Sequence, residues 1–141
     1  MSLPRNASMP GSAVVPTLPY GDVLAAARWL ERVFGLSIRL QIGTHRVQLV
    51  TPEGGDIVVV QAGGLSTRSA LMARVVDVDA LHARVTAEGG QVSGPPQTHP
   101  YGERQFTVTD CGGHVWTFSQ SVTDVDPRHW GGAPGPGFDQ A

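Results

Sequence analysis

The chain contains an internal duplication, and this repeat constrains the fold more than any other feature of its sequence. Two segments with helical spacing, 22–35 and 77–90, each begin with aspartate and end with glycine, at an offset of 55. Two glycine-containing segments, TPEGGDIVVVQ (51–61) and TDCGGHVWTFS (109–119), align without gaps at an offset of 58. Self-similarity at a fixed spacing indicates repeated supersecondary units. We therefore interpret the 141 residues as two small halves that share a core.

Each half has the same order of expected elements. We predict Asp22 and Asp77 to be the N-caps of two helices, because apolar residues at helical spacing follow both and a glycine ends each run. One strand-like run precedes each helix, and three follow it. The expected strands lie within 13–20, 36–43, 45–51 and 56–62 in the first half, and within 69–76, 91–94, 103–109 and 114–120 in the second. Each half is thus a βαβββ module, and the fold class is α+β.

The two ends of the chain differ in composition from the middle. Residues 1–12 and 126–141 are polar and punctuated by proline and glycine, so we expect a flexible N-terminal arm and a Pro/Gly-rich tail anchored by Trp130. The folded domain is then 13–125. Its first module is 13–63 and its second is 69–121.

Composition excludes several classes of function. The net charge is −2 with no run of lysine or arginine, which disfavours a nucleic-acid partner. No apolar stretch approaches the roughly 20 residues that span a bilayer, and the first 12 residues lack the pattern of a signal peptide. The single cysteine, Cys111, excludes an internal disulfide and a cysteine-based zinc site. We expect a cytoplasmic protein without a membrane partner.

Three features resemble the vicinal-oxygen-chelate superfamily, which includes glyoxalase I, extradiol dioxygenases and bleomycin-resistance proteins. They are ARWLERVFGL, the paired aspartate-to-glycine helices, and YGERQFTVTDCGGHVWTFSQ, which is similar to the DPxGHxW hairpin of a glyoxalase/bleomycin-resistance-like branch. Cys111 stands where proline is usual in that hairpin. The resemblance covers roughly 13–125. It implies paired βαβββ modules whose mixed sheets curl into a cup, usually completed in a homodimer.

The resemblance also implies where a metal ion would lie. In metal-using members the ligands are typically His or Gln, Glu, His and Glu, from the first and last strands of each module. Counting from the helix caps and the glycine turns places these positions on Val15, Val59, Ala70 and Thr117. Valine and alanine offer no lone pair, and a threonine hydroxyl is a weak ligand. A shift of one residue brings no better donor, so we predict no metal and no cofactor.

Alternation along the strands divides their residues between two faces. We assign to the cup face Val15, Thr17, Pro19, Ile57, Val59, Gln61, Ala70, Met72, Arg74, Val115, Thr117 and Ser119. The opposite face, which we expect to pack under the helices, has Leu18, Val58, Val60, Leu71, Ala73, Val75, Trp116 and Phe118. Small apolar groups with a few polar ones suit a small organic ligand. The alternative is a face that packs against itself or against a partner chain.

From this division we predict a ligand-binding set and no catalytic residue. The set consists of Thr17, Gln61, Met72, Arg74, Thr117, Ser119, Tyr101 and Trp130. Arg74 needs a partner, either a carboxylate or phosphate on the ligand or an internal Asp or Glu. We interpret His114 as structural, with its imidazole bonded to the turn backbone. Cys111 is interpreted as an incidental thiol, because Asp110 opposes formation of the thiolate.

The sequence thus favours a metal-free small-molecule binding protein of the glyoxalase/bleomycin-resistance type, which sequesters an antibiotic or a metabolite. One alternative is a glyoxalase-like enzyme, of the lyase or dioxygenase type, with an atypical or absent metal site. A second is a structural or regulatory dimer whose cup is filled by its own side chains.

Overall fold

The structure is a computed structural model that describes residues 2–63 and 67–138. The first module contains β1 (Thr17–Tyr20), α1 (Val23–Trp29), the π-helical turn η1 (Leu30–Phe34), β2 (Ser37–Ile42), β3 (Arg46–Val50) and β4 (Asp56–Gln61). The second contains β5 (Ala70–Arg74), α2 (Val78–Ala87), β6 (Gln91–Val92), β7 (Gln97–Thr98), β8 (Glu103–Thr109) and β9 (Val115–Ser121), and the 3-10 turn η2 (Pro127–Trp130) follows.

Each module forms one mixed sheet. Sheet A has the order β1-β4-β3-β2, and sheet B has the order β5-β9-β8-β6 with the short β7 also paired to β8. The first strand of each module runs parallel to its last strand, and the remaining pairs are antiparallel. The predicted α+β fold of two βαβββ modules with curled mixed sheets is confirmed. The short β7 is an addition that the sequence pattern did not predict.

Both helices begin directly after the predicted N-caps, and the first helical segment ends at Gly35 as predicted, whereas α2 ends at Ala87, before the predicted Gly90. The Asp22 carboxylate accepts a hydrogen bond from the backbone N–H of Ala25 at 3.1 Å, and Asp77 accepts one from Ala80 at 3.0 Å. Both caps satisfy a backbone donor that has no partner within its helix. Gly35 ends the first helix at a φ of 75°, in the left-handed region that glycine adopts without a steric penalty.

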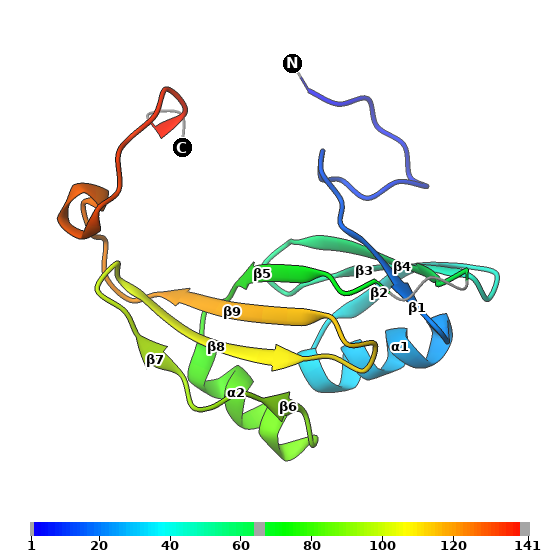
Figure 1. Ribbon diagram of the computed structural model, residues 1–141. Helices are drawn as coiled ribbons and strands as arrows, with labels where there is room; N and C mark the ends of the chain where they lie inside the picture. Colours follow the sequence, from blue (N-terminus) through cyan, green and yellow to red (C-terminus); the bar gives the residue numbers. More distant parts are fainter. Residues whose placement is uncertain (1, 64–66, 139–141) are drawn as a thin grey trace.

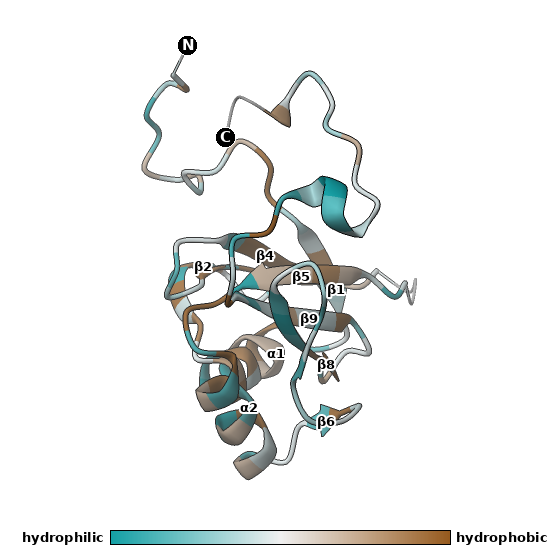
Figure 2. Ribbon diagram, turned by 90° about the vertical axis from the view of Figure 1, so that its left-hand side faces the viewer, coloured by the Kyte–Doolittle hydropathy of each residue, from teal (hydrophilic) through white to brown (hydrophobic). Residues whose placement is uncertain are grey.

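Both helices lie on the same side of the two sheets. Figure 1 shows α1 and α2 below the strands and both terminal segments above them, and the view turned by 90° shows the same separation (Figure 2). The modules share one apolar core between helices and sheets. Phe34 of the first module contacts the rings of Trp116 and Phe118 of the second, at centroid distances of 5.1 and 5.0 Å. The faces of the sheets turned away from the helices are called the open faces below.

The glycine hairpins match at an offset of 59 rather than the predicted 58. Thr51 N donates to Gly55 O at 2.8 Å, and Asp110 N donates to His114 O at the same distance. Gly54 and Gly113 are the positive-φ residues of the two turns, with φ of 99° and 87°. The gapless alignment matched Thr51 with Thr109 by identity. The structure pairs Thr51 with Asp110, because both side chains accept the N–H that closes the turn.

This shift of one residue reverses the predicted faces of β4. Ile57 and Val59 were assigned to the cup face, but both are buried in the core beneath the helices, and Leu18 lies beside Val59 in register. Gln61 lies beside the buried Tyr20 and donates to the Gly21 carbonyl at 2.7 Å. The open face of β4 instead has Asp56, Val58 and Val60. The predictions for Ile57, Val59, Gln61, Val58 and Val60 were therefore wrong, since a one-residue slip exchanges the two faces of a strand.

Candidate functional site

The open face of sheet B holds most of the residues predicted to bind a ligand. Its strand register places Met72 beside Thr117 and Arg74 beside Ser119, and both pairs point away from the helices. The neighbouring strand β8 adds Gln105 opposite Ser119 and Thr107 opposite Thr117. Met72 is 64% exposed, so an apolar contact is available next to these polar groups.

A chain of hydrogen bonds connects the polar side chains of this face. Ser119 Oγ donates to Glu103 Oε1 at 2.6 Å and accepts from Gln105 Nε2 at 2.9 Å. Tyr101 OH donates to Gln105 Oε1 at 3.2 Å. Ser119 is only 1% exposed and its hydroxyl already bonds to two side chains, so it positions Glu103 and Gln105. An incoming ligand would therefore meet these two residues and not Ser119.

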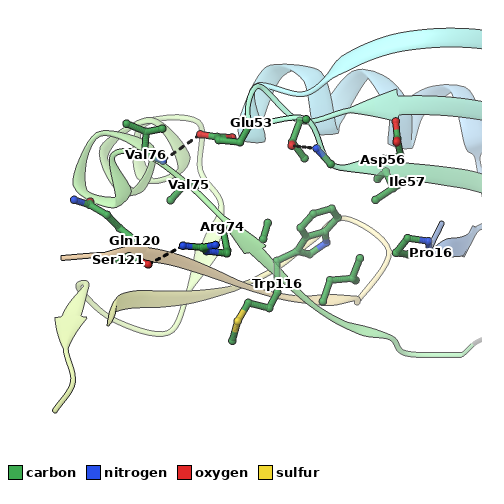
Figure 3. A pocket seen from close by; sticks show the side chains of 16 residues that line it. Pro16, Glu53, Asp56, Ile57, Arg74, Val75, Val76, Trp116, Gln120 and Ser121 are labelled. Carbon is green, nitrogen blue, oxygen red and sulfur yellow. Dashed lines mark hydrogen bonds between the residues drawn. The ribbon is translucent and has the colours of Figure 1, made fainter. Parts of the chain in front are cut away.

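The Glu103 carboxylate is the acidic group of this chain. Partial burial acts to raise its pKa, but hydrogen bonds from Ser119 and Ser121 and the positive charge of Arg74 outweigh that effect. The pKa of Glu103 therefore lies below its ordinary value of 4.5. Arg74 itself donates to Ser121 Oγ at 2.9 Å (Figure 3). The face thus carries a carboxylate and a guanidinium at neutral pH.

A groove of about 690 Å³ runs along the outer edge of β5. One wall is β5 itself, with Met72 and Arg74, and the other is the β3–β4 hairpin, where Glu53 accepts a hydrogen bond from Val76 N at 3.2 Å (Figure 3). The Trp116 side chain lies at the groove floor between these walls. The volume is within the range of small-molecule sites, and the lining is mixed apolar and polar.

Aromatic side chains lie next to a second groove of about 430 Å³, which Arg74, Tyr101 and Glu103 line. The Tyr101 ring stacks on His99 at a centroid distance of 5.1 Å and an interplanar angle of 3°. The ring centroid of Trp130, in η2, lies 5.3 Å from that of Tyr101. The tail therefore reaches the end of sheet B through Trp130. Arg74 lines both grooves and connects them.

Two of the predicted ligand-binding residues lie elsewhere. Thr17 is on β1 at the edge of sheet A, and Gln61 is at the end of β4 on the helix side of that sheet. The structure brings the others to sheet B or its rim, namely Met72, Arg74, Thr117, Ser119, Tyr101 and Trp130. Sequence reasoning missed Glu103 and Gln105. Their alternation with the core residue Phe106 could have placed them on this face.

The residues at the positions that hold a metal ion in related folds are not suited to bind one here. With the corrected hairpin offset, the residue equivalent to Thr117 is Val58 and not Val59, while Val15 and Ala70 keep the offset of the helices. Three of these four side chains have no donor atom, and the fourth is a hydroxyl. Within 2–63 and 67–138, no three His, Cys, Asp or Glu side chains gather in a metal-binding arrangement.

Two residues near the last hairpin are structural. His114 is fully buried on the face of Trp116, where its Nδ1 accepts from Ser69 N at 3.0 Å and its Nε2 lies 2.8 Å from Pro19 O. The imidazole thus bonds to backbone groups of two other segments, and not to its own turn as predicted. Burial, together with the charge of Asp110, raises the pKa of the Cys111 thiol to about 11. A thiol with such a pKa is a poor nucleophile at neutral pH.

The family is shown by the match of its sequence model to residues 13–118. That model describes the glyoxalase/bleomycin resistance protein/dioxygenase superfamily. The chain belongs to this superfamily, as the hairpin and helix motifs predicted. Among curated proteins, none matches the sequence of this chain. In the part of the chain that the structure describes, no helix has the length and apolar character needed to cross a membrane.

Similar solved structures agree with this assignment. TioX from Micromonospora sp. ML1 is 34% identical, with a TM-score of 0.68 over 82% of this chain and 100% of TioX. A glyoxalase-related enzyme from Fulvimarina pelagi is 26% identical, with a TM-score of 0.62 over 77% of this chain and 87% of the enzyme. A bleomycin resistance determinant encoded on the transposon Tn5 has the same fold, at 17% identity and a TM-score of 0.67 over 79% and 99% of the two chains.

Proposed function

We propose that this protein binds a small organic ligand on the open face of sheet B without a metal ion, and thereby sequesters an antibiotic or a metabolite. The observation that carries the proposal is the set of donor atoms. The four positions that would ligate a metal are Val15, Val58, Ala70 and Thr117. Beside Thr117 lies a row of groups suited to an organic molecule, with Gln105 and Tyr101 as hydrogen-bonding groups and Met72 as an apolar contact.

The proposed ligand carries an anionic or strongly accepting group. Arg74 lines both grooves, and among the described residues its side chain makes one hydrogen bond, to Ser121. A guanidinium has five N–H donors, so most of its capacity is left for a ligand. The exposed side chain of Met72 and the Tyr101–Trp130 pair offer apolar surface on either side. A ligand with an organic body and one carboxylate or similar group would satisfy both features.

A thermal-shift screen tests the proposal. Purified protein is heated with a panel of antibiotics and aromatic metabolites, each with and without EDTA. We expect a ligand that raises the melting temperature equally in both conditions, because no metal takes part. A hit whose effect disappears with EDTA would contradict the proposal.

Substitutions then locate the site for any hit. The variant Arg74→Ala should weaken binding roughly 10- to 100-fold, the usual loss for a hydrogen bond to a charged group. Thr117→Val removes one neutral hydrogen bond and should weaken binding roughly 3- to 10-fold. The matched control is Thr17→Val on sheet A, which should leave the dissociation constant unchanged. Equal effects of the two threonine substitutions would place the ligand elsewhere.

A second candidate is a glyoxalase-like enzyme, which the glyoxalase-related relative from Fulvimarina pelagi favours at 26% identity. Elemental analysis of the purified protein separates the candidates. A stoichiometric divalent metal, or a rise in melting temperature with Ni²⁺, Zn²⁺ or Mn²⁺, would support the enzyme and overturn the metal-free binder.

We also propose that the protein is a cytoplasmic homodimer whose two modules form one domain within 13–125. No described strand pairs with the outer edge of β5, and the nearby Met72 and Val76 are exposed. An unpaired strand edge with apolar side chains is a surface that a second chain covers. Light scattering after size exclusion should give twice the chain mass of 14.9 kDa. A mass of one chain at all concentrations would contradict the dimer.

A further inference from the structure

The segment 6–12, predicted to be part of a flexible arm, lies across the open face of sheet A. Figure 1 shows the dark blue N-terminal segment on the side of the sheet opposite α1. We call residues 6–12 the strap. A turn at Asn6 begins it, because the Asn6 side chain accepts from Ser8 N at 3.0 Å and the Asn6 carbonyl accepts from Met9 N at 3.0 Å. The strap is therefore an ordered piece of main chain with its own local structure.

Three side chains of sheet A hold the strap, one from each of three strands. Arg39 Nη2 donates to the Ala7 carbonyl at 2.8 Å, and Gln48 Nε2 donates to the Ser8 carbonyl at 2.9 Å. Asp56 Oδ2 accepts from Ser12 N at 3.2 Å and from Ser12 Oγ at 2.6 Å. Three of these four bonds go to backbone groups of the strap. The sheet thus binds main-chain carbonyl and amide groups, and the single side-chain bond is to the Ser12 hydroxyl.

The register between β2 and β3 orients the Arg39 and Gln48 side chains toward the strap. The pairing of β2 with β3 shifts between Ile38 and Leu40, which leaves Arg39 at a β-bulge. A bulge redirects the side chain of the extra residue. Arg39 Nη1 also donates to Gln48 Oε1, so the Gln48 amide has a partner at both ends. The arginine and the glutamine therefore form one unit.

Burial shows that the strap covers this face. Gln48 is 3% exposed and its register neighbour Val58 is 2% exposed, although both lie on the side away from the helices. Pro10 of the strap is itself buried. A buried amide without partners is unfavourable, so Gln48 needs either the strap or a replacement for it.

We propose that the open face of sheet A is a docking surface for the main-chain groups of a turn-containing segment, and that the chain's own residues 6–12 occupy it as a removable cover. Arg39, Gln48 and Asp56 are the recognition residues. A molecule that presents the same carbonyl and amide groups competes with the strap for this surface. Of these three residues only Asp56 also lines the groove along β5, whereas Arg39 and Gln48 lie outside it. The tests below therefore rest on Arg39 and Gln48, so that this proposal and the ligand site on sheet B can fail separately.

Hydrogen exchange of the full-length chain tests how the strap is held. The Ser12 amide is bonded to Asp56, so its exchange should be slow in the wild-type chain. In the double variant Arg39→Ala, Gln48→Ala it should become at least about tenfold faster, while the β8 and β9 amides exchange as before. The matched control Arg46→Ala removes an arginine from the same sheet and should leave Ser12 protected. Unchanged exchange in the double variant would overturn the proposal.

A peptide added in trans tests whether the surface docks main chain. The full-length variant Pro10→Asp, Ser12→Ala weakens the strap and keeps the three recognition residues. A synthetic peptide of residues 2–12, SLPRNASMPGS, should then shift the NMR signals of the Gln48 side-chain amide and the Val58 backbone amide in a saturable way. The wild-type chain, whose surface is occupied, should show no such shift at the same concentration. The same peptide with Asp and Ala at positions 10 and 12 is the control.

Each outcome of the peptide experiment decides the proposal. Saturable shifts confined to the strap-weakened variant support it. Equal shifts in both proteins would mean that the peptide binds another surface, and would overturn it. No shift in the variant, with the β8 and β9 signals unchanged as evidence of folding, would also overturn it.

Discussion

Asp110 is the residue on which the junction of the two modules depends. Its carboxylate accepts from Trp116 Nε1 and from His114 N at 2.9 Å, and it also accepts from the hydroxyl of Tyr20 in the first module. Burial raises the pKa of Tyr20 far above its ordinary value of 10.0, and the charge of Asp110 adds to this. The phenol therefore stays protonated as a permanent donor between modules.

Removing this donor should destabilise the protein. Tyr20→Phe deletes one hydrogen bond to a buried carboxylate and should lower the free energy of unfolding by about 1.5–3 kcal/mol. Urea denaturation followed by tryptophan fluorescence measures the change. The control Tyr101→Phe breaks a longer bond to the neutral Gln105 and should cost less than about 1 kcal/mol. Equal costs would mean that Asp110 does not hold the tyrosine as inferred.

The ionisation of Glu103 should make the stability of the fold depend on pH. Because its folded pKa lies below the unfolded value of 4.5, the ionised group stabilises the fold above that pH, and the contribution is lost as the pH falls through the lower, folded pKa. Glu103→Gln should abolish this part of the acid sensitivity. Melting temperatures between pH 3 and 6 measure it. A variant with the wild-type slope below pH 4.5 would contradict the assignment.

Side chains at special positions show the limits of residue-level prediction. The structural role of His114 and its face could be predicted, because strand alternation places it with Trp116. Its partners, Ser69 and Pro19, could not, since both are remote in sequence. The facing of Gln61 was predicted wrongly, because the alignment by identity matched Thr51 with Thr109, whereas the turn places Thr51 in the position of Asp110.

At the scale of elements, Gly102 fixes the route of the chain after β9. It has a φ of 85°, and a Cβ at this position would come within 2.2 Å of the Thr123 carbonyl oxygen. Its own carbonyl accepts from Val122 N at 2.9 Å. The segment that leads to η2 is therefore held against the turn between β7 and β8, and this contact brings Trp130 toward Tyr101.

A side chain at residue 102 should displace the segment that leads from β9 to η2. Gly102→Ala should lower the free energy of unfolding by more than about 1 kcal/mol, because it combines an unfavourable φ with a steric clash. The control Gly131→Ala also has a positive φ, of 98°, but meets nothing within 4 Å. Chemical denaturation of both variants compares them. A larger cost at Gly131 would show that strain alone, and not the close approach, determines the effect.

The helices were the most predictable elements and the hairpins the least. Asp22 and Asp77 were identified because N-capping and apolar spacing are local properties.

Removing either cap, by Asp22→Ala or Asp77→Ala, should lower the free energy of unfolding by about 0.5–2 kcal/mol in chemical denaturation. The control Asp124→Ala, which caps none of the described helices, should be neutral. A neutral result at both caps would contradict their role.

For the whole molecule, the duplication predicted the fold and which residues lie on the open face of sheet B. It did not predict how the two modules pack against each other. That arrangement rests on long-range contacts such as Phe34 with Trp116, which no local pattern encodes. The same holds for the strap. Its composition indicated flexibility, whereas its order comes from Arg39 and Gln48 on distant strands. The faces of β5 and β9 were assigned correctly from alternation, whereas the faces of β4 were exchanged by the one-residue error in the hairpin alignment.

The hydrogen bond between Tyr20 and Asp110 joins residues 90 positions apart, one in each module. Expressing the two modules as separate polypeptides would therefore break it. A polypeptide that ends after β4 would leave a phenol without its acceptor and Phe34 in water, while its complement would keep an anion with no cross-module donor. Neither piece should accumulate in soluble form by itself. Produced together in one cell, the pieces should reassemble, because every lost contact is restored when they meet.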